Sequence, residues 1–164
     1  MNRRARLALL LLLAWPLAAP ALSTDRRQPI HLEADTADID DRSGLSVYRG
    51  NVTLDQGSLH ITADELRVHL KDGEIDRIYA SGRPATFRQR PDGKDQDVEG
   101  EALRMEYHAT QDRLILLEQA QVRQGGDSFA SERIVYDITT DQVQAGAGGS
   151  DRVRIIIQPR REKP

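Results

Sequence analysis

Three residues close together in the chain have the side-chain types of a hydrolase triad: Ser58, His60 and Asp64. A serine nucleophile needs a histidine base held by an acid, and it is usually presented on a sharp turn between a strand and a helix. Ser58 and His60 instead lie on the polar side of a predicted strand, and no such turn pattern surrounds Ser58. We therefore expect no catalytic residues and predict that the protein is not an enzyme.

A second candidate site is a metal site formed by His31, Glu33 and Asp35, which share one face of a predicted strand. His60 occupies the same place as His31 in a repeated motif described below, three residues before a small residue. That recurrence favours a solvated strand face, so we expect no metal and no other cofactor.

Two further motifs match known sites only in part. "DIDDRSG" at residues 38–44 resembles a calcium-binding loop, but Arg42 stands where an oxygen ligand belongs and no glutamate closes the loop. The triplet Asn51-Val52-Thr53 is a glycosylation signal by pattern, but it lies inside a predicted strand. Neither motif is predicted to be functional.

The elements that carry these residues have an unusual alternation. In "SLHITADELRVHL", residues 58–70, the apolar residues Leu59 and Ile61 occupy odd positions, whereas Leu66 and Val68 occupy even ones. Side chains of a strand alternate between two faces, so a change of phase keeps one face apolar only if the chain bulges or turns a corner. We predict such a corner at Ala63-Asp64-Glu65.

The same pattern occurs four times, each time with a small residue followed by an acid. The pairs are Ala34-Asp35, Ala63-Asp64, Gly100-Glu101 and Ser131-Glu132, at spacings of 29, 37 and 31 residues. A small residue at a corner allows backbones to approach closely. Near-equal spacing is typical of repeat architectures, so the sequence predicts stacked rungs that each turn a corner.

The intervening segments also have strand patterns, and no window shows sustained helical periodicity. "KDGE" at 71–74 and "PDGK" at 91–94 indicate tight hairpin turns. The predicted fold is therefore all-β, built from many short, mostly antiparallel strands.

The first 21 residues are predicted to be a secretory signal. Arginines at positions 3, 4 and 6 precede the apolar run 7–14, and Ala19-Pro20-Ala21 supplies small residues for cleavage after Ala21. The run is shorter than the roughly 20 residues of a membrane-spanning helix, and without cysteine the chain has no site for a lipid anchor or a disulfide. Cleavage leaves 20 basic and 26 acidic residues, a net charge of −6, which disfavours nucleic acid as a partner.

The apolar strand faces allow two interpretations. Two sheet faces lined by Leu, Ile and Val either pack on each other as a closed core or stay slightly apart and hold an aliphatic ligand. Most apolar faces are simply core, and periodicity does not distinguish the two.

Several motifs in order resemble the OstA-like family of periplasmic lipopolysaccharide-export bridge proteins. They are "QPIHLEAD" at 28–35, "YRGNVTLDQGSLHITADELRV" at 48–68, "GRPATF" at 82–87, "VEGEALRMEY" at 98–107 and "ASERIVYD" at 130–137. The segment "DRLILLEQA" at 112–120 departs from the pattern, because it lacks the glycine that "RGNVTL" has at the matching place.

The resemblance implies a V-shaped β-jellyroll with an open hydrophobic groove that carries lipid A acyl chains of lipopolysaccharide across the periplasm. It divides the chain into a signal peptide (1–21), a short mature N-terminal segment (22–27), the OstA-like domain (28–158) and a polar tail (159–164). The groove residues implied are Ile30, Leu32, Leu59, Ile61, Leu66, Val68, Phe87, Leu103, Met105, Tyr107, Phe129, Ile134 and Tyr136.

The resemblance also implies partners at the two edges of the sheet, because an unpaired edge strand is a template for another chain. The edge with Ile30, Leu32 and Ile39 would meet an inner-membrane (LptC-like) component, and the edge with Val153, Ile155 and Ile157 an outer-membrane (LptD-like) one. Further copies would associate head to tail. The alternative is a structural β-rung module of the cell envelope that binds no lipid.

Overall fold

The computed structural model describes residues 25–91, 93–146 and 152–159, so the predicted signal peptide, its cleavage site and the last residues of the tail lie outside the described residues. Strands dominate the described chain, with two short 3-10 helices, η1 (Asp25–Arg27) and η2 (Ala109–Gln111). The strands are β1 (His31–Glu33), β2 (Thr36–Asp40), β3 (Leu45–Gln56), β4 (Leu59–Lys71), β5 (Glu74–Gln89), β6 (Val98–His108), β7 (Arg113–Gln124), β8 (Asp127–Asp137), β9 (Gln142–Ala145) and β10 (Arg154–Ile156).

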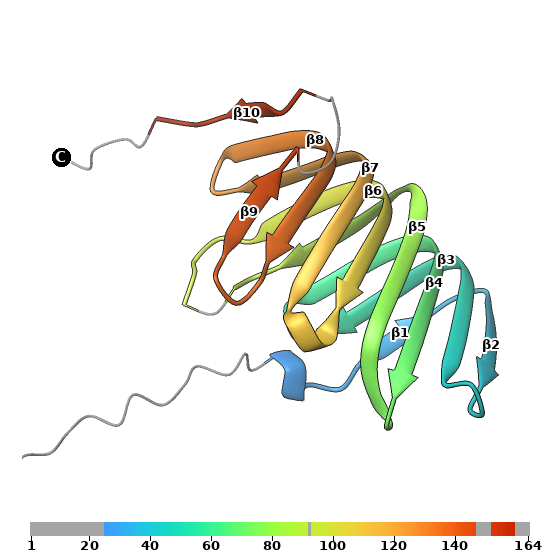
Figure 1. Ribbon diagram of the computed structural model, residues 1–164. Helices are drawn as coiled ribbons and strands as arrows, with labels where there is room; N and C mark the ends of the chain where they lie inside the picture. Colours follow the sequence, from blue (N-terminus) through green and yellow to red (C-terminus); the bar gives the residue numbers. More distant parts are fainter. Residues whose placement is uncertain (1–24, 92, 147–151, 160–164) are drawn as a thin grey trace, which may run out of the picture.

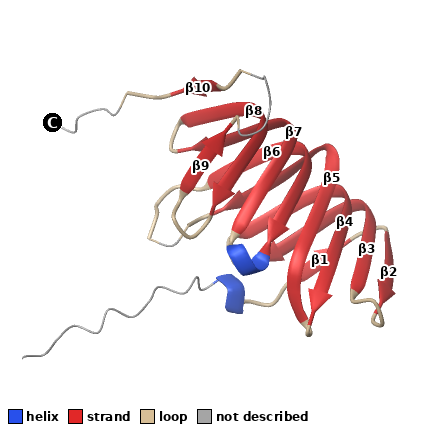
Figure 2. Ribbon diagram, in the orientation of Figure 1, coloured by secondary structure: helices blue, strands red, loops and turns tan. Residues whose placement is uncertain are grey.

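All strands belong to one antiparallel sheet that follows the chain order (Figures 1 and 2). The sheet runs from β1 through β3 to β8 and on to β10, while β2 also pairs with β3 and β9 with β8. The two ends of this order do not pair with each other. The prediction of an all-β, mostly antiparallel fold is confirmed, and the sheet is open.

A crease crosses the sheet, and it is the corner predicted from the phase flips. The pairing register shifts in every adjacent pair from β3 to β8, for example between Arg49 and Val52 of β3 and between Leu117 and Ala120 of β7. We call the side with β1, β10 and residues 52–63, 85–91, 93–102 and 120–131 the first wing. The side with β2, β9 and residues 45–49, 65–81, 104–117 and 133–137 is the second wing. Both wings turn apolar faces inward.

The odd-numbered long strands turn the corner with unusual backbone conformations. Gly50 (φ 79°) and Asn51 (φ 45°) do so in β3, and Glu118 (φ 64°) and Gln119 (φ 55°) in β7. "DRLILLEQA" therefore needs no glycine, because two non-glycine residues adopt the left-handed conformation and the strand continues unbroken. A cis Arg83-Pro84 bond lies at the crease in β5.

At the first copy of the motif, the corner separates β1 from β2. The backbone N–H of Asp35 donates to the carbonyl of Gly50 at 2.9 Å, and the Asn51 side-chain amide donates to Asp35 Oδ2 at 2.9 Å. A Cβ at Gly50 would lie 2.2 Å from Asp35 Oδ2, so only glycine fits under this carboxylate.

The third copy of the motif was placed two residues too early. In β6 the register shifts between Glu101 and Arg104, so the small residue at the corner is Ala102 rather than Gly100. Ala102 is fully buried, which leaves Leu103 on the outer face, where it lines a surface hollow with Arg83 and Glu118. The prediction that Leu103 faces the interior was wrong. Gly100-Glu101 matches the motif of a small residue followed by an acid, but the chain turns at Ala102, which is followed by Leu103 instead of an acid.

Both predicted turns lie between antiparallel strands, but only "KDGE" forms a tight two-residue hairpin. Lys71 pairs with Glu74 across Asp72 (φ 55°) and Gly73 (φ 82°), as a two-residue hairpin requires. "PDGK" instead lies within the longer connection from Gln89 to Val98, where the Lys94 N–H donates to the Pro91 carbonyl.

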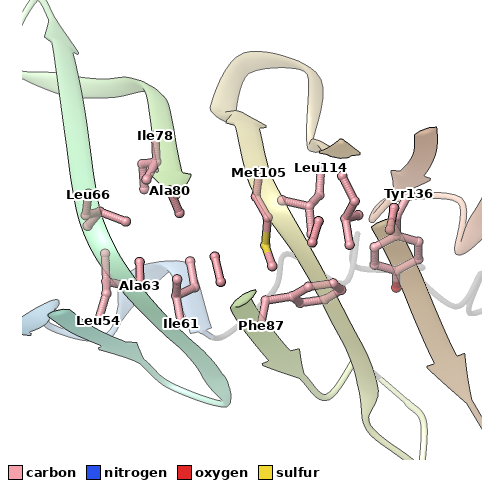
Figure 3. Packing of buried hydrophobic residues seen from close by; sticks show 14 of the residues in the cluster. Leu54, Ile61, Ala63, Leu66, Ile78, Ala80, Phe87, Met105, Leu114 and Tyr136 are labelled. Carbon is pink, nitrogen blue, oxygen red and sulfur yellow. The ribbon is translucent and has the colours of Figure 1, made fainter. Parts of the chain in front are cut away.

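The core lies between the two wings and continues along the whole sheet (Figure 3). Leu54 and Ile61 of the first wing face Leu66 and Ile78 of the second, and Phe87 stacks on Tyr136 with ring centroids 6.3 Å apart. Within the described residues, no helix has the length and apolar character needed to cross a membrane.

Candidate functional site

Most of the predicted groove residues lie between the wings. Those that are almost fully buried are Ile61, Leu66, Val68, Phe87, Met105, Ile134 and Tyr136. Leu32, Leu59, Tyr107 and Phe129 are partly buried against this core, and Ile30 is exposed. The interior is thus a packed apolar layer over much of its length, and it opens only locally.

The opening is a narrow hollow of about 80 Å³ near the N-terminal segment. Its walls come from both wings and are mainly aliphatic and aromatic. The predicted residues that line it are Ile30, Leu59, Ile61, Phe87 and Tyr107, and sequence reasoning missed Leu54, Ile75, Ile78, Leu114 and Ile138, as well as the polar residues Asp25, Gln56 and Gln89. The signal that identifies the missed aliphatic residues is the same inward phase in the neighbouring strands.

The N-terminal segment covers one side of this hollow. The Ser58 hydroxyl donates a short hydrogen bond to Asp25 Oδ2, and the Gln56 side-chain amide donates to the Gln28 carbonyl at 3.1 Å. Both partners lie at the tip of the first wing. These bonds hold η1 and Ile30 against the apolar walls.

A polar cluster joins the tips of the two wings nearer the other end of the sheet. Asp141, in the turn between β8 and β9, accepts hydrogen bonds from the Gln124 side chain at 3.0 and 3.1 Å and from the Tyr136 hydroxyl at 3.1 Å. Lys94 Nζ lies 3.1 Å from Asp141 Oδ2. Burial, reinforced by the Asp141 charge, raises the pKa of Tyr136, so its hydroxyl remains a donor at neutral pH.

The predicted edge residues lie at the two ends of the sheet. Ile39 is 63% exposed in β2, and Leu32 is half-buried in β1. At the opposite end, Ile155 is 53% and Ile157 71% exposed. Leu32 pairs with Leu54 and Ile155 with Phe129, so both edges extend the apolar inner face.

The residues of the hydrolase pattern do not come together. The Ser58 hydroxyl bonds Asp25, whereas His60 Nδ1 lies 2.6 Å from Asp55 Oδ1. Asp64 lies on the exposed side of the crease. The arrangement therefore provides no serine, base and acid relay.

The other polar motifs have local structural roles. Asp40 accepts hydrogen bonds from the Ser43 hydroxyl and the Arg42 and Ser43 backbone amides, which lower its pKa and close the turn between β2 and β3. Asn51 of the glycosylation triplet lies within β3 and bonds Asp35. In the described ranges, no group of three or more His, Asp or Glu residues has a metal-binding arrangement, and His31 and Glu33 are exposed on β1.

Comparisons with known proteins agree with this architecture. The family model for "LptA/(LptD N-terminal domain) LPS transport protein" matches residues 31–142. The lipopolysaccharide export system protein LptH of Pseudomonas aeruginosa is 40% identical over 153 residues, covering 88% of this chain and 87% of that protein. LptA of Escherichia coli K12 is 33% identical over 150 residues, covering 90% and 80%.

A solved structure shows the same fold. The crystal structure of P. aeruginosa LptH, described as the periplasmic LptA-homologous component of the lipopolysaccharide transport device, superposes with a TM-score of 0.77 at 34% identity. The match covers 82% of this chain and 99% of that one. The names of these relatives describe transport rather than catalysis. The chain therefore belongs to the family of LptA and LptD N-terminal domain lipopolysaccharide (LPS) transport proteins.

Proposed function

We propose that this protein carries LPS between the inner and outer membranes and holds the lipid A acyl chains between its two apolar wings. The observation that carries the proposal is the hollow between the wings, whose aliphatic walls come from both sides of the crease. The relatives of this protein are named for the export of LPS, and the acyl chains are the aliphatic part of LPS. The protein acts without chemistry and passes its cargo on unchanged.

Acyl chains enter only when the wings separate or their side chains move. The hollow of about 80 Å³ is smaller than the roughly 300–1,000 Å³ of ordinary ligand pockets. Burying one methylene contributes about 0.8 kcal/mol, so a site that enclosed several chains completely would release them very slowly. Partial shielding between the wings keeps binding weak enough for hand-over.

The phosphorylated headgroup stays in water outside the wings. The chain has a net charge of −3 with its leader and −6 without it, and an acidic surface disfavours contact with phosphate groups. The protein therefore recognises LPS through its acyl chains.

The edges of the sheet serve assembly. The edge with β1 and β2 receives an LptC-like domain at the inner membrane, the edge with β10 an LptD-like domain at the outer membrane, and further copies join head to tail. The exposed apolar residues Ile39, Ile155 and Ile157 support this role. Strand addition would cover them and continue the apolar inner face.

The protein works in the periplasm as residues 22–164, with residues 28–158 forming one domain and 159–164 a polar tail. Cleavage after Ala21 removes Trp15, the only tryptophan. Mass spectrometry of the exported protein, together with the absence of tryptophan fluorescence, tests this cut.

Photo-crosslinking from adjacent residues on opposite faces tests the carrier function. Leu59 lines the hollow, whereas His60 lies on the outer face with Arg88 and Glu99. A photo-reactive amino acid at Leu59 should form an adduct with LPS in cells, and one at His60 should not. Purified protein should give the same adduct with intact LPS and none with deacylated LPS.

Absence of an adduct at both Leu59 and Tyr107, which lines the same hollow, would contradict the carrier function. If the protein still contacted its envelope partners, the structural β-rung module would be the correct description. Equal adducts at Leu59 and His60 would also contradict binding between the wings.

A further inference from the structure

The two edges of the sheet carry opposite charge. Residues 28–41, which include β1 and β2, contain five acids and no lysine or arginine, whereas residues 152–159, which include β10, contain two arginines and no acid. We call the first segment the acidic edge and the second the basic edge. Both are exposed along most of their length.

Four of these seven charged side chains, those of Glu33, Asp41, Arg152 and Arg154, have no partner within the described chain. Asp38 pairs with Arg49, Asp35 with Asn51, and Asp40 with its own turn. Glu33 on β1 and Arg154 on β10 make no ion pair or hydrogen bond through their side chains with other described residues. An exposed charge beside an unpaired strand edge is available to a neighbouring molecule.

Glu33 and Arg154 also lie on the same side of the sheet. Leu32 pairs with the buried Leu54, so the next residue, Glu33, faces outward. Ile155 pairs with Phe129, which packs against the core, so Arg154 faces outward as well. Both belong to the first wing, with an inward-facing apolar residue beside each.

The topology allows one copy to continue the sheet of another. The order from β1 through β3–β8 to β10 contains eight strands with antiparallel pairing throughout, so its two end strands run in opposite directions. A second copy in the same orientation therefore places its β1 antiparallel to β10 of the first. Outer-face side chains of adjacent strands then lie close together, and opposite charges attract.

We propose that charge complementarity between the acidic edge and the basic edge determines the order in which copies of this chain assemble, with Glu33 beside Arg154 of the next copy. Joining two acidic edges or two basic edges places like charges side by side and is disfavoured. Glu132, which lines the same hollow as Arg152 and Arg154, lies outside their ion-pairing distance and leaves them available. The inference rests on the self-association proposed above.

Charge reversal tests the inference on the protein expressed from its full gene and purified from the periplasm. Sedimentation velocity at about 0.05 M NaCl should show that Glu33→Arg and Arg154→Glu each weaken self-association about 5- to 10-fold. The double variant, which restores opposite charges, should regain most of the wild-type affinity. About 0.5 M NaCl should weaken wild-type association and reduce the difference between variants.

Glu74→Arg is the matched control, since Glu74 is exposed at the hairpin tip between β4 and β5, away from both edges. It makes the same change in net charge as Glu33→Arg and should leave association unchanged. Wild-type association that neither reversal weakens would overturn the charge inference and leave the proposed function intact. No association of the wild type at either salt concentration would instead reject head-to-tail assembly itself, and LPS adducts at Leu59 would still report on the carrier function.

Discussion

At the residue level, Gly100 packs directly against the ring of Phe87 in the interior. A Cβ at Gly100 would lie 2.1 Å from Phe87 Cε1 and 3.0 Å from Leu116 Cδ2. Gly100 therefore serves packing, whereas the corner of β6 belongs to Ala102. A small residue in a strand has two separate uses, and only its neighbours show which one applies.

We predict that Gly100→Ala lowers the free energy of unfolding by about 1–3 kcal/mol, because overpacking forces the Phe87 ring out of its position. Urea denaturation of the single variant measures the loss. Phe87→Leu in the same chain should recover part of it, since the smaller side chain leaves room for the methyl group. Additive losses in the double variant would show that the two residues do not compete for this space.

Residue types also explain which polar predictions were sound. His60 was correctly placed on the outer face of a strand, whereas Ser58 lies in the turn between β3 and β4, and the partners of the two residues, Asp55 and Asp25, come from neighbouring segments. Alternation predicts the face of a side chain because it depends on strand geometry alone. Which side chains form hydrogen bonds with each other depends on the register of the adjacent strand, and the pattern of a single strand does not specify that register.

At the scale of strands, the crease is built in two ways. The even-numbered long strands use a small residue, such as Ala63 in β4, and the odd-numbered ones use left-handed or cis backbone. The small residues were visible in the sequence. Glu118 and Gln119 gave no such signal, because neither residue type favours a positive φ.

Gln119 offers a direct test of the backbone at the crease. We predict that Gln119→Gly raises the free energy of unfolding by about 0.5–1 kcal/mol, because glycine adopts a positive φ without the steric cost of a side chain. Gln121→Gly, two residues further along β7 and outside the left-handed region, should lower it by about 0.5–1 kcal/mol. Thermal or urea denaturation compares them, and a loss of stability in both variants would argue against a strained corner.

At the scale of the whole molecule, the two wings form one unit because contacts cross between them. Asp141 extends from the tip of the second wing and contacts Gln124 and Lys94 at the tip of the first. It also accepts the hydrogen bond of Tyr136, whose side chain is almost completely buried. Removing the carboxylate leaves that hydroxyl without its partner.

Asp141→Ala is predicted to lower the free energy of unfolding by about 1–3 kcal/mol, the cost of a buried polar group that loses its hydrogen bond. Adding Tyr136→Phe should cost little more, because the unsatisfied hydroxyl is removed as well. A double-mutant cycle by urea denaturation measures the coupling. Independent effects of the two substitutions would mean that this hydrogen bond contributes nothing to the stability of the protein.

The sequence alone predicts the strand-rich fold, the presence of corners within the strands and the inward face of most strands. These properties follow from local alternation, because a strand exposes every second side chain to the same environment. Ile61, Leu66, Phe87 and Tyr136 could be assigned to the interior in this way.

Which part of the interior is packed and which is hollow depends on contacts between strands that are distant in sequence. Ile75, Ile78 and Leu114 line the hollow with Leu59 because strands distant in sequence bring them together, and η1 covers them from the N-terminus. The position of the corner in β6, and hence the outward direction of Leu103, was likewise set by pairing with β5 and β7. Packing depends on the side chains that face each other across the fold, and alternation within one strand does not specify them.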